Sequence, residues 1–279
     1  MSAGKDMSFM GHIGELRGHL IRCIIAIIIG GLIVGFNIEW IMDHIFFGPV
    51  RNDFPTFRVV NLISQQLAGE NAIVLPDDFP IRVQKLYQQF NVMMSVSVIG
   101  GVVVAFPYIV WELWRFVSPA LHPRERKNSA ILINSVWILF LLGILSGYFL
   151  ILPFAINFAV LFKISDIIEP LYDLSDYTAL FFQIVLGMGI VFLFPVIVYF
   201  LTTIGILTPK FLKTYRRHAI VLIMVIAAVI TPADVMSMFM AAIPLLILFE
   251  FSIALCARTY KRIQKEQQKN NPPTEVQEA

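Results

Sequence analysis

The sequence predicts an all-α membrane protein with six transmembrane helices, and three observations lead to this fold class. Of the 279 residues, 58% are hydrophobic and 14% are charged, which is too little charge to cover a soluble globule of this size. Apolar runs close to the roughly 20 residues that a spanning helix needs recur along the chain. Bilayers admit only helices and closed barrels, and these runs are too long for barrel strands.

The predicted spans are separated by polar segments. They cover approximately residues 20–42, 90–117, 130–158, 179–201, 215–230 and 235–257. No A-x-A-like cleavage site follows the first apolar run, so we expect the N-terminal segment to be retained. Residues 1–258 are therefore the predicted transmembrane domain, and the polar residues 259–279 are expected to form a disordered cytoplasmic tail.

Lysines and arginines predict the orientation of these spans. They are concentrated in the N-terminal segment, in the loops after the second and fourth spans, and in the C-terminal tail, whereas the other loops carry few. By the positive-inside rule both termini face the cytoplasm. An even number of spans is then required, and six satisfies this condition.

The fifth predicted span is short for a bilayer. Its roughly 13 to 16 residues cover about 20 to 24 Å, whereas the hydrocarbon core is about 30 Å thick. Basic side chains at its start extend to the headgroups, or the bilayer thins beside it, or longer neighbours enclose it. In the first outward loop, residues 43–89, the stretch VVNLISQQLAG predicts a short amphipathic helix.

The stretch HIGELRGHL places charged and polar side chains directly before the first span. As a helix it carries one polar side and one apolar side, which predicts a segment lying along the membrane interface before it enters the bilayer. The polar side is His12, Glu15, His19 and Arg22. Glu15 either faces the cytoplasm as a binding group or pairs with Arg17 or Arg22. The spacing of His12, Glu15 and His19 also permits a metal triad, but no fourth ligand follows and we expect no metal.

A second acidic residue lies in the loop FVSPALHPRERK. Pro123 predicts the start of the third span, which puts Glu125 in the first helical turn, where the helix dipole favours an ionised carboxylate. This glutamate is either an ordinary first-turn residue or a partner of Glu15. Because a carboxylate matches the planar fork of a guanidinium, two acids at one cytoplasmic level predict a docking site for arginines.

Three polar residues interrupt otherwise apolar runs: Glu112, Gln183 and Glu250. Such groups are costly in a membrane and usually face the bundle interior or a partner. Glu112 either extends the docking surface or pairs with Arg115.

Three stretches together resemble the TatC family, the multispanning subunit of the twin-arginine protein translocase. They are HIGELRGHLIR near the start, FNVMMSVSVIGGVVVAFPYIVWELWRFVSPALHPRERK, and LTPKFLKTYRRHAIVLIMVIAAVITPADVMSMFMAAIPLLILFE. The motifs are H-x-x-E-L-R, W-x-F-x-x-P-A-L followed by E-R, and T-P-x-D between the last two spans. The resemblance covers nearly the whole chain.

The resemblance implies a fold and a function. The fold is a concave, glove-like six-helix bundle with short helices 5 and 6. The function is that of a receptor for twin-arginine signal peptides of folded precursors, not of an enzyme, acting with single-span TatA and TatB subunits and driven by the proton gradient. It implies a bacterial inner-membrane location, assembly into a complex with further copies, and no cofactor.

The resemblance also implies roles for individual residues. Glu15 and Glu125 match the family's signal-binding acids, with Arg17 and Phe116 in the same neighbourhood. Pro49 and Asp234 match functionally sensitive positions in the outward loops. Where relatives often carry a glutamate and a glutamine, this chain has Leu193 and Met238. Contact with the single-span partners is then expected to rest on packing, or on Gln183.

Two other functions fit the sequence less well. A proton-coupled small-molecule transporter would use Glu112, Glu250 and Asp234 as a relay, but the matching pair of broken helices typical of such proteins is missing from the sequence. An intramembrane protease would need a histidine deep in a span or an H-E-x-x-H motif, and neither occurs.

Overall fold

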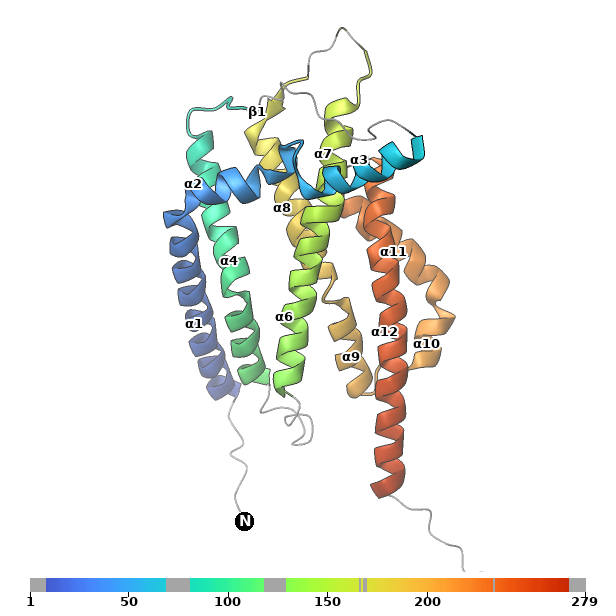
Figure 1. Ribbon diagram of the computed structural model, residues 1–279. Coiled ribbons are helices and arrows are strands. Elements are labelled where there is room, and N and C mark those ends of the chain that lie inside the picture. Colours follow the sequence, from blue (N-terminus) through green and yellow to red (C-terminus); the bar gives the residue numbers. More distant parts are fainter. Residues whose placement is uncertain are drawn as a thin grey trace, which may run out of the picture. The chain divides into compact units, whose positions relative to one another are not determined.

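The computed structural model describes residues 9–68, 81–117, 129–165, 167, 170–232 and 234–270, and most of them are helical (Figure 1). Within this described part, five stretches are long and apolar enough to cross a membrane. They are Gly14–Phe36, Gln88–Phe116, Ile133–Leu161, Leu174–Thr203 and Val235–Lys265. The predicted all-α membrane class is confirmed. The chain divides into two compact units, Met1–Ile138 with Lys163–Ala179, and Leu139–Phe162 with Leu180–Ala279.

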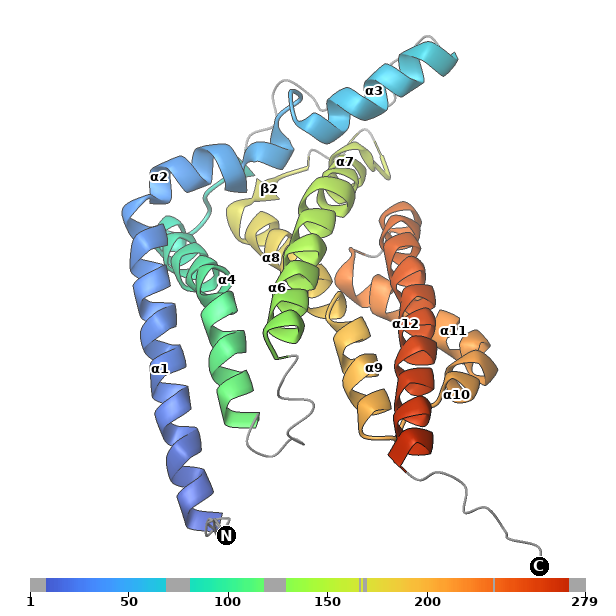
Figure 2. The ribbon, with the colours of Figure 1, turned by 60° about the horizontal axis from the view of Figure 1, so that its bottom comes forward.

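In the first unit, helices α1 (Phe9–Phe36) and α4 (Gln88–Val117) pack along each other (Figures 1 and 2). Glycines make the close approach possible. A Cβ atom on Gly101 would lie 2.5 Å from the backbone nitrogen of Gly31, and one on Gly30 would lie 2.7 Å from the carbonyl oxygen of Gly101. Small residues at such a crossing let the two backbones meet, which replaces side-chain interdigitation with direct backbone packing.

Helix α1 differs from the predicted first span at both ends. It runs without a break from Phe9, so the separate interfacial segment predicted for HIGELRGHL is wrong; nothing in this stretch stops a helix before the apolar run. The helix ends at Phe36 rather than near residue 42 because Asn37 leaves the helical conformation (φ −108°, ψ 22°). The Asn37 side chain donates to the carbonyl oxygen of Ile33 at 2.8 Å.

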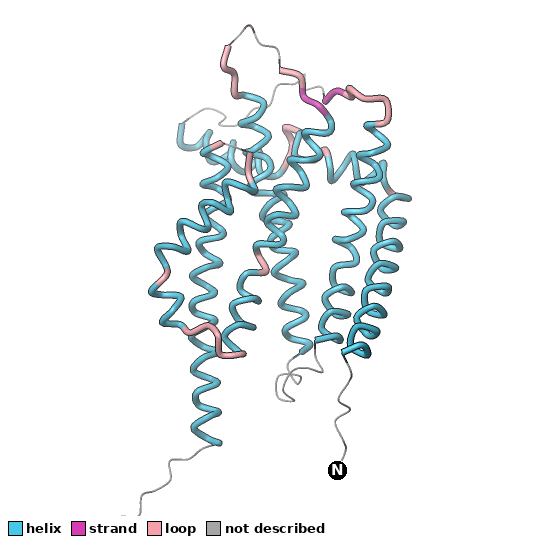
Figure 3. The backbone as a smooth tube through the Cα atoms, turned by 180° about the vertical axis from the view of Figure 1, so that it is seen from behind, coloured by secondary structure: helices cyan, strands magenta, loops and turns pink. Residues whose placement is uncertain are grey.

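After Asn37 the chain forms α2 (Ile38–Ile41), a π-helix (Met42–Phe46), a 3-10 helix (Gly48–Val50) and α3 (Pro55–Ala68). Helix α3 contains the amphipathic stretch predicted from the sequence. Strand β1 (Ile81–Arg82) pairs in parallel with β2 (Tyr172–Asp173), drawn in magenta in Figure 3.

Buried Gln88 joins these segments at the start of α4. Its amide nitrogen donates to Asp173 Oδ1 at 2.5 Å and to Ser175 Oγ at 2.7 Å. Its amide oxygen accepts from the backbone nitrogens of Gln84 and Lys85 at 2.7 and 3.1 Å. One side chain thus holds the approach to α4 and the approach to α8 (Leu174–Val191) together.

The second unit contains the remaining helices. They are the later part of α6 (Ser129–Ser146), a π-helix (Gly147–Ile151), α7 (Leu152–Leu161), the later part of α8 (Leu174–Val191), α9 (Phe194–Thr203), α10 (Pro209–Thr214), α11 (Arg216–Ile230) and α12 (Val235–Asn270). Helix α12 packs against α9, α11 and α7 (Figure 2). A buried cluster of Val198, Leu212, Phe249, Ile253 and Cys256 forms part of this core, so Cys256 is a packing residue.

Prolines account for two breaks in the third and fourth predicted spans. A π-helix precedes Pro153, which is at the start of α7. The fourth span is interrupted at Phe192 and Leu193, directly before Pro195 at the start of α9. Proline lacks the N–H that continues a helix and clashes with the preceding turn. The third span is therefore one helix with a π-helical segment, whereas the fourth is interrupted by a short turn.

The last two helices match the sequence expectation only in part. Helix α11 has 15 residues, which at 1.5 Å per residue is about 22 Å, short for a bilayer as predicted. The expectation of a short sixth helix is wrong, because α12 has 36 residues and continues to Asn270. Residues 259–270, predicted as disordered tail, are helical, since lysine, arginine, glutamine and glutamate are good helix formers that extend an existing helix cheaply.

Candidate functional site

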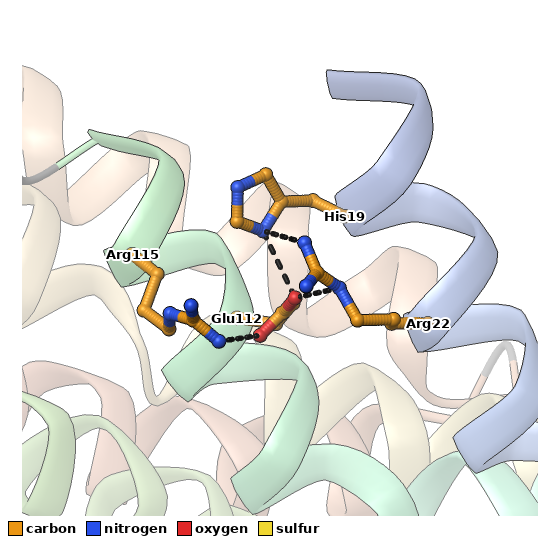
Figure 4. Close-up of polar contacts among 4 residues, drawn as sticks. All are labelled: His19, Arg22, Glu112 and Arg115. Atoms are coloured by element: carbon orange, nitrogen blue, oxygen red, sulfur yellow. Dashed lines mark hydrogen bonds and ion pairs between the residues drawn. The ribbon is translucent and has the colours of Figure 1, made fainter. Parts of the chain in front are cut away.

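The first unit contains a buried carboxylate, Glu112 of α4, which is 0% exposed. Arg22 Nε lies 2.5 Å from its Oε1, and Arg115 Nη1 lies 3.5 Å from its Oε2. His19 Nδ1 lies 3.0 Å from Oε1 (Figure 4). His19 and Arg22 come from α1, whereas Arg115 is one turn further along α4. We call these four residues the Glu112 cluster.

Helical spacing explains how the Glu112 cluster forms. His19 and Arg22 are three residues apart, and so are Glu112 and Arg115, which puts each pair on one helix face. The close approach of α1 and α4 at their glycines then brings the two faces together. The sequence grouped His19 with Arg22 correctly, but their contact with Glu112 depends on how the helices pack. The predicted pairing of Glu112 with Arg115 occurs. Arg22, which was not predicted as a partner, lies nearer to the Glu112 carboxylate.

The hydrogen bonds also indicate the tautomer of His19. A carboxylate accepts only, so Nδ1 must carry a proton to bond Glu112. Arg22 Nη2 lies 3.4 Å from the same nitrogen, and it cannot donate to a nitrogen that already carries a proton. The shorter contact to a charged acceptor is the stronger one. One carboxylate therefore faces two guanidiniums and an imidazole, which leaves the cluster with net positive charge.

Aromatic rings surround this cluster. The Phe116 ring meets His19 edge to face, with 5.7 Å between centroids. The Arg115 guanidinium lies 4.9 Å above the Trp111 ring, and Trp111 contacts Tyr108. Tryptophan and tyrosine gather where a membrane meets water, and arginine stabilises their ring faces. This end of α1 and α4 has the composition of an interface.

Glu15 and Arg17 lie beyond the cluster toward the start of α1, and both are exposed. Glu15 is one turn, about 6 Å, before His19 on the same helix face. Among the residues that the structure describes, neither Glu15 nor Arg17 makes an ion pair. The alternative in which Glu15 pairs with Arg22 does not occur, because Arg22 is held by Glu112.

Of the predicted signal-binding residues, Glu15, Arg17 and Phe116 lie in the described part of the chain. Phe116 contacts His19, one turn from Glu15, at the end of α4. Glu125 and the side chain of His12 lie outside the described residues. No group of three histidine, cysteine or acidic side chains within the described ranges has the arrangement of a metal site.

The two residues predicted to be functional in the outward loops, Pro49 and Asp234, lie in different units. Pro49 is buried in the 3-10 helix of the first unit. Asp234, in the second unit, caps α12: its Oδ2 accepts from the backbone nitrogen of Ser237 at 2.6 Å. The other carboxylate oxygen of Asp234 is buried and makes no hydrogen bond within the described part of the chain, nor does the Ser237 hydroxyl.

The predicted partner-contact residues of the second unit lie in α8, in the break before α9, and in α12. Gln183 donates to the carbonyl oxygen of Val229 at 2.6 Å, which satisfies a carbonyl in the last turn of α11. Leu193 precedes α9 at the break, and Met238 is half-buried in α12. Glu250 forms an ion pair with Arg216, and both side chains are about half exposed.

Two residues that hold segments of the first unit together were not singled out from the sequence. Gln88 links the segments around β1 and β2, and the Tyr177 hydroxyl donates to the carbonyl oxygen of Phe46. Tyr177 also stacks on Phe47, with 5.7 Å between ring centroids. The sequence offered only a weak signal for either, since a glutamine at a helix start and a tyrosine near an apolar run are common.

Comparison with known proteins identifies the family. A family model described as "Sec-independent protein translocase protein (TatC)" matches residues 11–244. The chain belongs to the TatC family. A TatC from Blattabacterium sp. subsp. Periplaneta americana is 41% identical over 251 residues, which cover 89% of this chain and 94% of that one. A TatC from Halalkalibacterium halodurans is 34% identical over 261 residues, 94% of this chain and 93% of that one.

Solved structures carry the same fold. A crystal structure of the twin-arginine translocase receptor TatC in DDM is 29% identical, with a TM-score of 0.68 over 88% of this chain and 98% of that chain. A second TatC receptor structure gives 28% identity and a TM-score of 0.63 over 89% and 99%. This TatC-family chain is a membrane component of a Sec-independent protein translocase, so the resemblance stated from its motifs is confirmed.

Proposed function

We propose that this chain is the receptor and core subunit of a twin-arginine translocase. Glu15, together with Glu125, binds the consecutive arginines of signal peptides on folded precursors at the cytoplasmic face. Arg17 and Phe116 line the same site. The chain acts without catalytic chemistry of its own, in complexes with further copies and with single-span TatA- and TatB-type subunits, and the proton gradient drives export.

One observation supports this proposal above the others. Glu15 is exposed and makes no ion pair among the described residues, whereas the neighbouring acid, Glu112, is buried and already occupied by two arginines. An exposed carboxylate that makes no ion pair in the described part of the chain can accept a guanidinium. The cluster also anchors α1 on α4, which holds Glu15 on a rigid element rather than on a loop.

We further propose six spans in a bacterial plasma membrane, with both termini in the cytoplasm. The span to be added to the five long helices is α11, the fifth in chain order, whose 15 residues fall short of a bilayer. The basic loops and tail support this orientation by the positive-inside rule. The rival transporter relay gains no support, since Glu112 and Glu250 each form an ion pair with an arginine.

A signal-peptide binding assay tests the receptor proposal. Purified protein in nanodiscs is titrated with a fluorescent peptide that carries two arginines, and with its two-lysine counterpart. Glu15→Gln and Glu125→Gln should each weaken binding about ten- to hundredfold, because each removes charge-assisted hydrogen bonds. The lysine peptide should bind more weakly to the unaltered protein, because a point charge cannot form the paired bonds of a guanidinium.

Glu39→Gln is the matched control. Glu39 is an exposed carboxylate in α2, past the other end of α1, and its loss should leave affinity unchanged. Unchanged affinity in both the Glu15 and Glu125 variants would remove the proposed site.

A further inference from the structure

A shallow groove of about 450 Å³ runs between α1 and α4 on the surface of the first unit. Nearly all of its lining is apolar. From α1 it is lined by Arg22, Ile25, Ala26, Ile29, Gly30 and Ile33, and from α4 by Val104, Ala105 and Tyr108. Arg22 lies at the end of the groove nearest the start of α1, so the groove has one charged group at that end and apolar side chains along the rest.

The dimensions of the groove fit a lipid chain. From Arg22 to Ile33 it follows α1 for about 16 Å, roughly half of a 30 Å hydrocarbon core, which is the depth of one leaflet. A spanning helix needs the full depth and a diameter of about 10 Å. The groove therefore matches an acyl chain better than a helix.

Arg22 is placed to meet a headgroup. Its guanidinium Nε faces Glu112, but the side chain is 44% exposed. Its Nη2 reaches back over Gly18, where a Cβ atom would lie 3.8 Å away, so the charge points from the groove toward the start of α1. Long basic side chains extend to the headgroup layer in this way. The rest of the guanidinium fork remains open to an acceptor.

Charge around Arg22 favours an anionic headgroup. The Glu112 cluster has two guanidiniums against one carboxylate. Tyr108 and Trp111, which contact each other, mark the same level as a membrane interface. Basic pockets between spanning helices at this depth recognise lipid phosphates.

We propose that this groove binds one chain of an anionic phospholipid whose phosphate pairs with Arg22. Glu112 then tunes the affinity, because it shares Arg22 with the lipid. The site is separate from the signal-binding acids and does not depend on the receptor proposal.

Two charge variants of opposite expected effect test the proposal. Protein reconstituted in mixed phosphatidylglycerol and phosphatidylcholine is extracted, and the lipids retained are counted by native mass spectrometry. The unaltered protein should retain phosphatidylglycerol preferentially. Arg22→Gln should lower that retention about tenfold or more, since a charge-assisted contact is lost. Glu112→Gln should raise it, since Arg22 is released to the phosphate.

This pair separates binding from damage to the fold. Both variants break the same Arg22 to Glu112 ion pair, so general destabilisation would move them in the same direction. Equal retention of the two lipids by the unaltered protein, or a fall in phosphatidylglycerol retention in both variants, overturns the proposal.

A steric pair tests the groove itself. Ile29 lines the groove and Ile28 does not, although they are 54% and 56% exposed. Ile29→Trp should fill the groove and reduce phosphatidylglycerol retention several-fold, whereas Ile28→Trp should leave it unchanged. If Ile29→Trp instead leaves lipid retention intact and weakens binding of the twin-arginine peptide, the groove holds the apolar part of the signal and the lipid proposal is wrong.

Discussion

Arg22 Nε of α1 lies 2.5 Å from the buried Oε1 of Glu112 in α4. This contact joins the first two spanning helices about two helical turns from Glu15. The apolar crossing at the glycines sets how near the helices come, and the ion pair sets their register. The position of the candidate docking acid therefore depends on a residue that itself has no exposed surface.

We expect Glu112→Ala to destabilise the first unit by about 1–3 kcal/mol, because a hydrogen-bonded charge is removed from a buried position. The loss stays modest because Arg22 and Arg115 are 44% and 48% exposed and regain water. Thermal unfolding in detergent measures it. Glu250→Ala is the control: its exposed pair with Arg216 is worth only about 0–1 kcal/mol. Equal losses in the two variants would contradict a special role for burial.

The α1 to α4 crossing should be sensitive to size at Gly101. We expect Gly101→Val to destabilise the protein by about 1–3 kcal/mol or more, because the added atoms overlap the backbone of Gly31. Gly14→Ala should have the opposite sign, a gain of about 0.5–1 kcal/mol, since no atom lies within 4 Å of its Cβ position and alanine favours a helix. Chemical denaturation in detergent gives both values, and a neutral Gly101→Val would show that the helices can separate freely.

Gln88→Met should destabilise the segments around β1 and β2. The substitution keeps length but removes the bonds to Asp173, Ser175 and two backbone nitrogens, for an expected loss of about 1–3 kcal/mol. Hydrogen exchange should rise at residues 84–85 and 172–175. Gln89→Met, at the exposed neighbouring position, should change neither quantity. Unaltered exchange in Gln88→Met would mean that these bonds are dispensable.

Asp234→Ala should weaken the start of α12 by about 1 kcal/mol, because the cap on the Ser237 nitrogen is lost. Asp234→Asn retains a capping oxygen and should lose little stability. If Asn also preserves export activity while Ala abolishes it, capping explains the sensitivity of this position. If both variants lose export activity while Asp234→Asn keeps its stability, the negative charge of Asp234 is what export requires.

The sequence was most informative where one physical rule acts alone. Length and apolarity were enough for the five long helices and for the shortness of α11, since the bilayer imposes a minimum length. The pattern could not show where α1 ends or α12 stops. Asn37 ends α1 through a bond to the Ile33 carbonyl, and the polar end of α12 stays helical through propensity rather than burial.

For the candidate site, the sequence by itself determined which acids stand near the helix ends that are predicted to face the cytoplasm, and which residues share a helix face. The pairing across helices was decided by the tertiary structure alone. The sequence predicts that His19 and Arg22 share one polar side of the helix with Glu15. The close packing of α1 and α4 turns His19 and Arg22 onto Glu112 and leaves Glu15 without an ion pair among the described residues. Helical periodicity fixes the direction in which a side chain leaves its helix, but the packing of a second helix decides which charged group that side chain contacts.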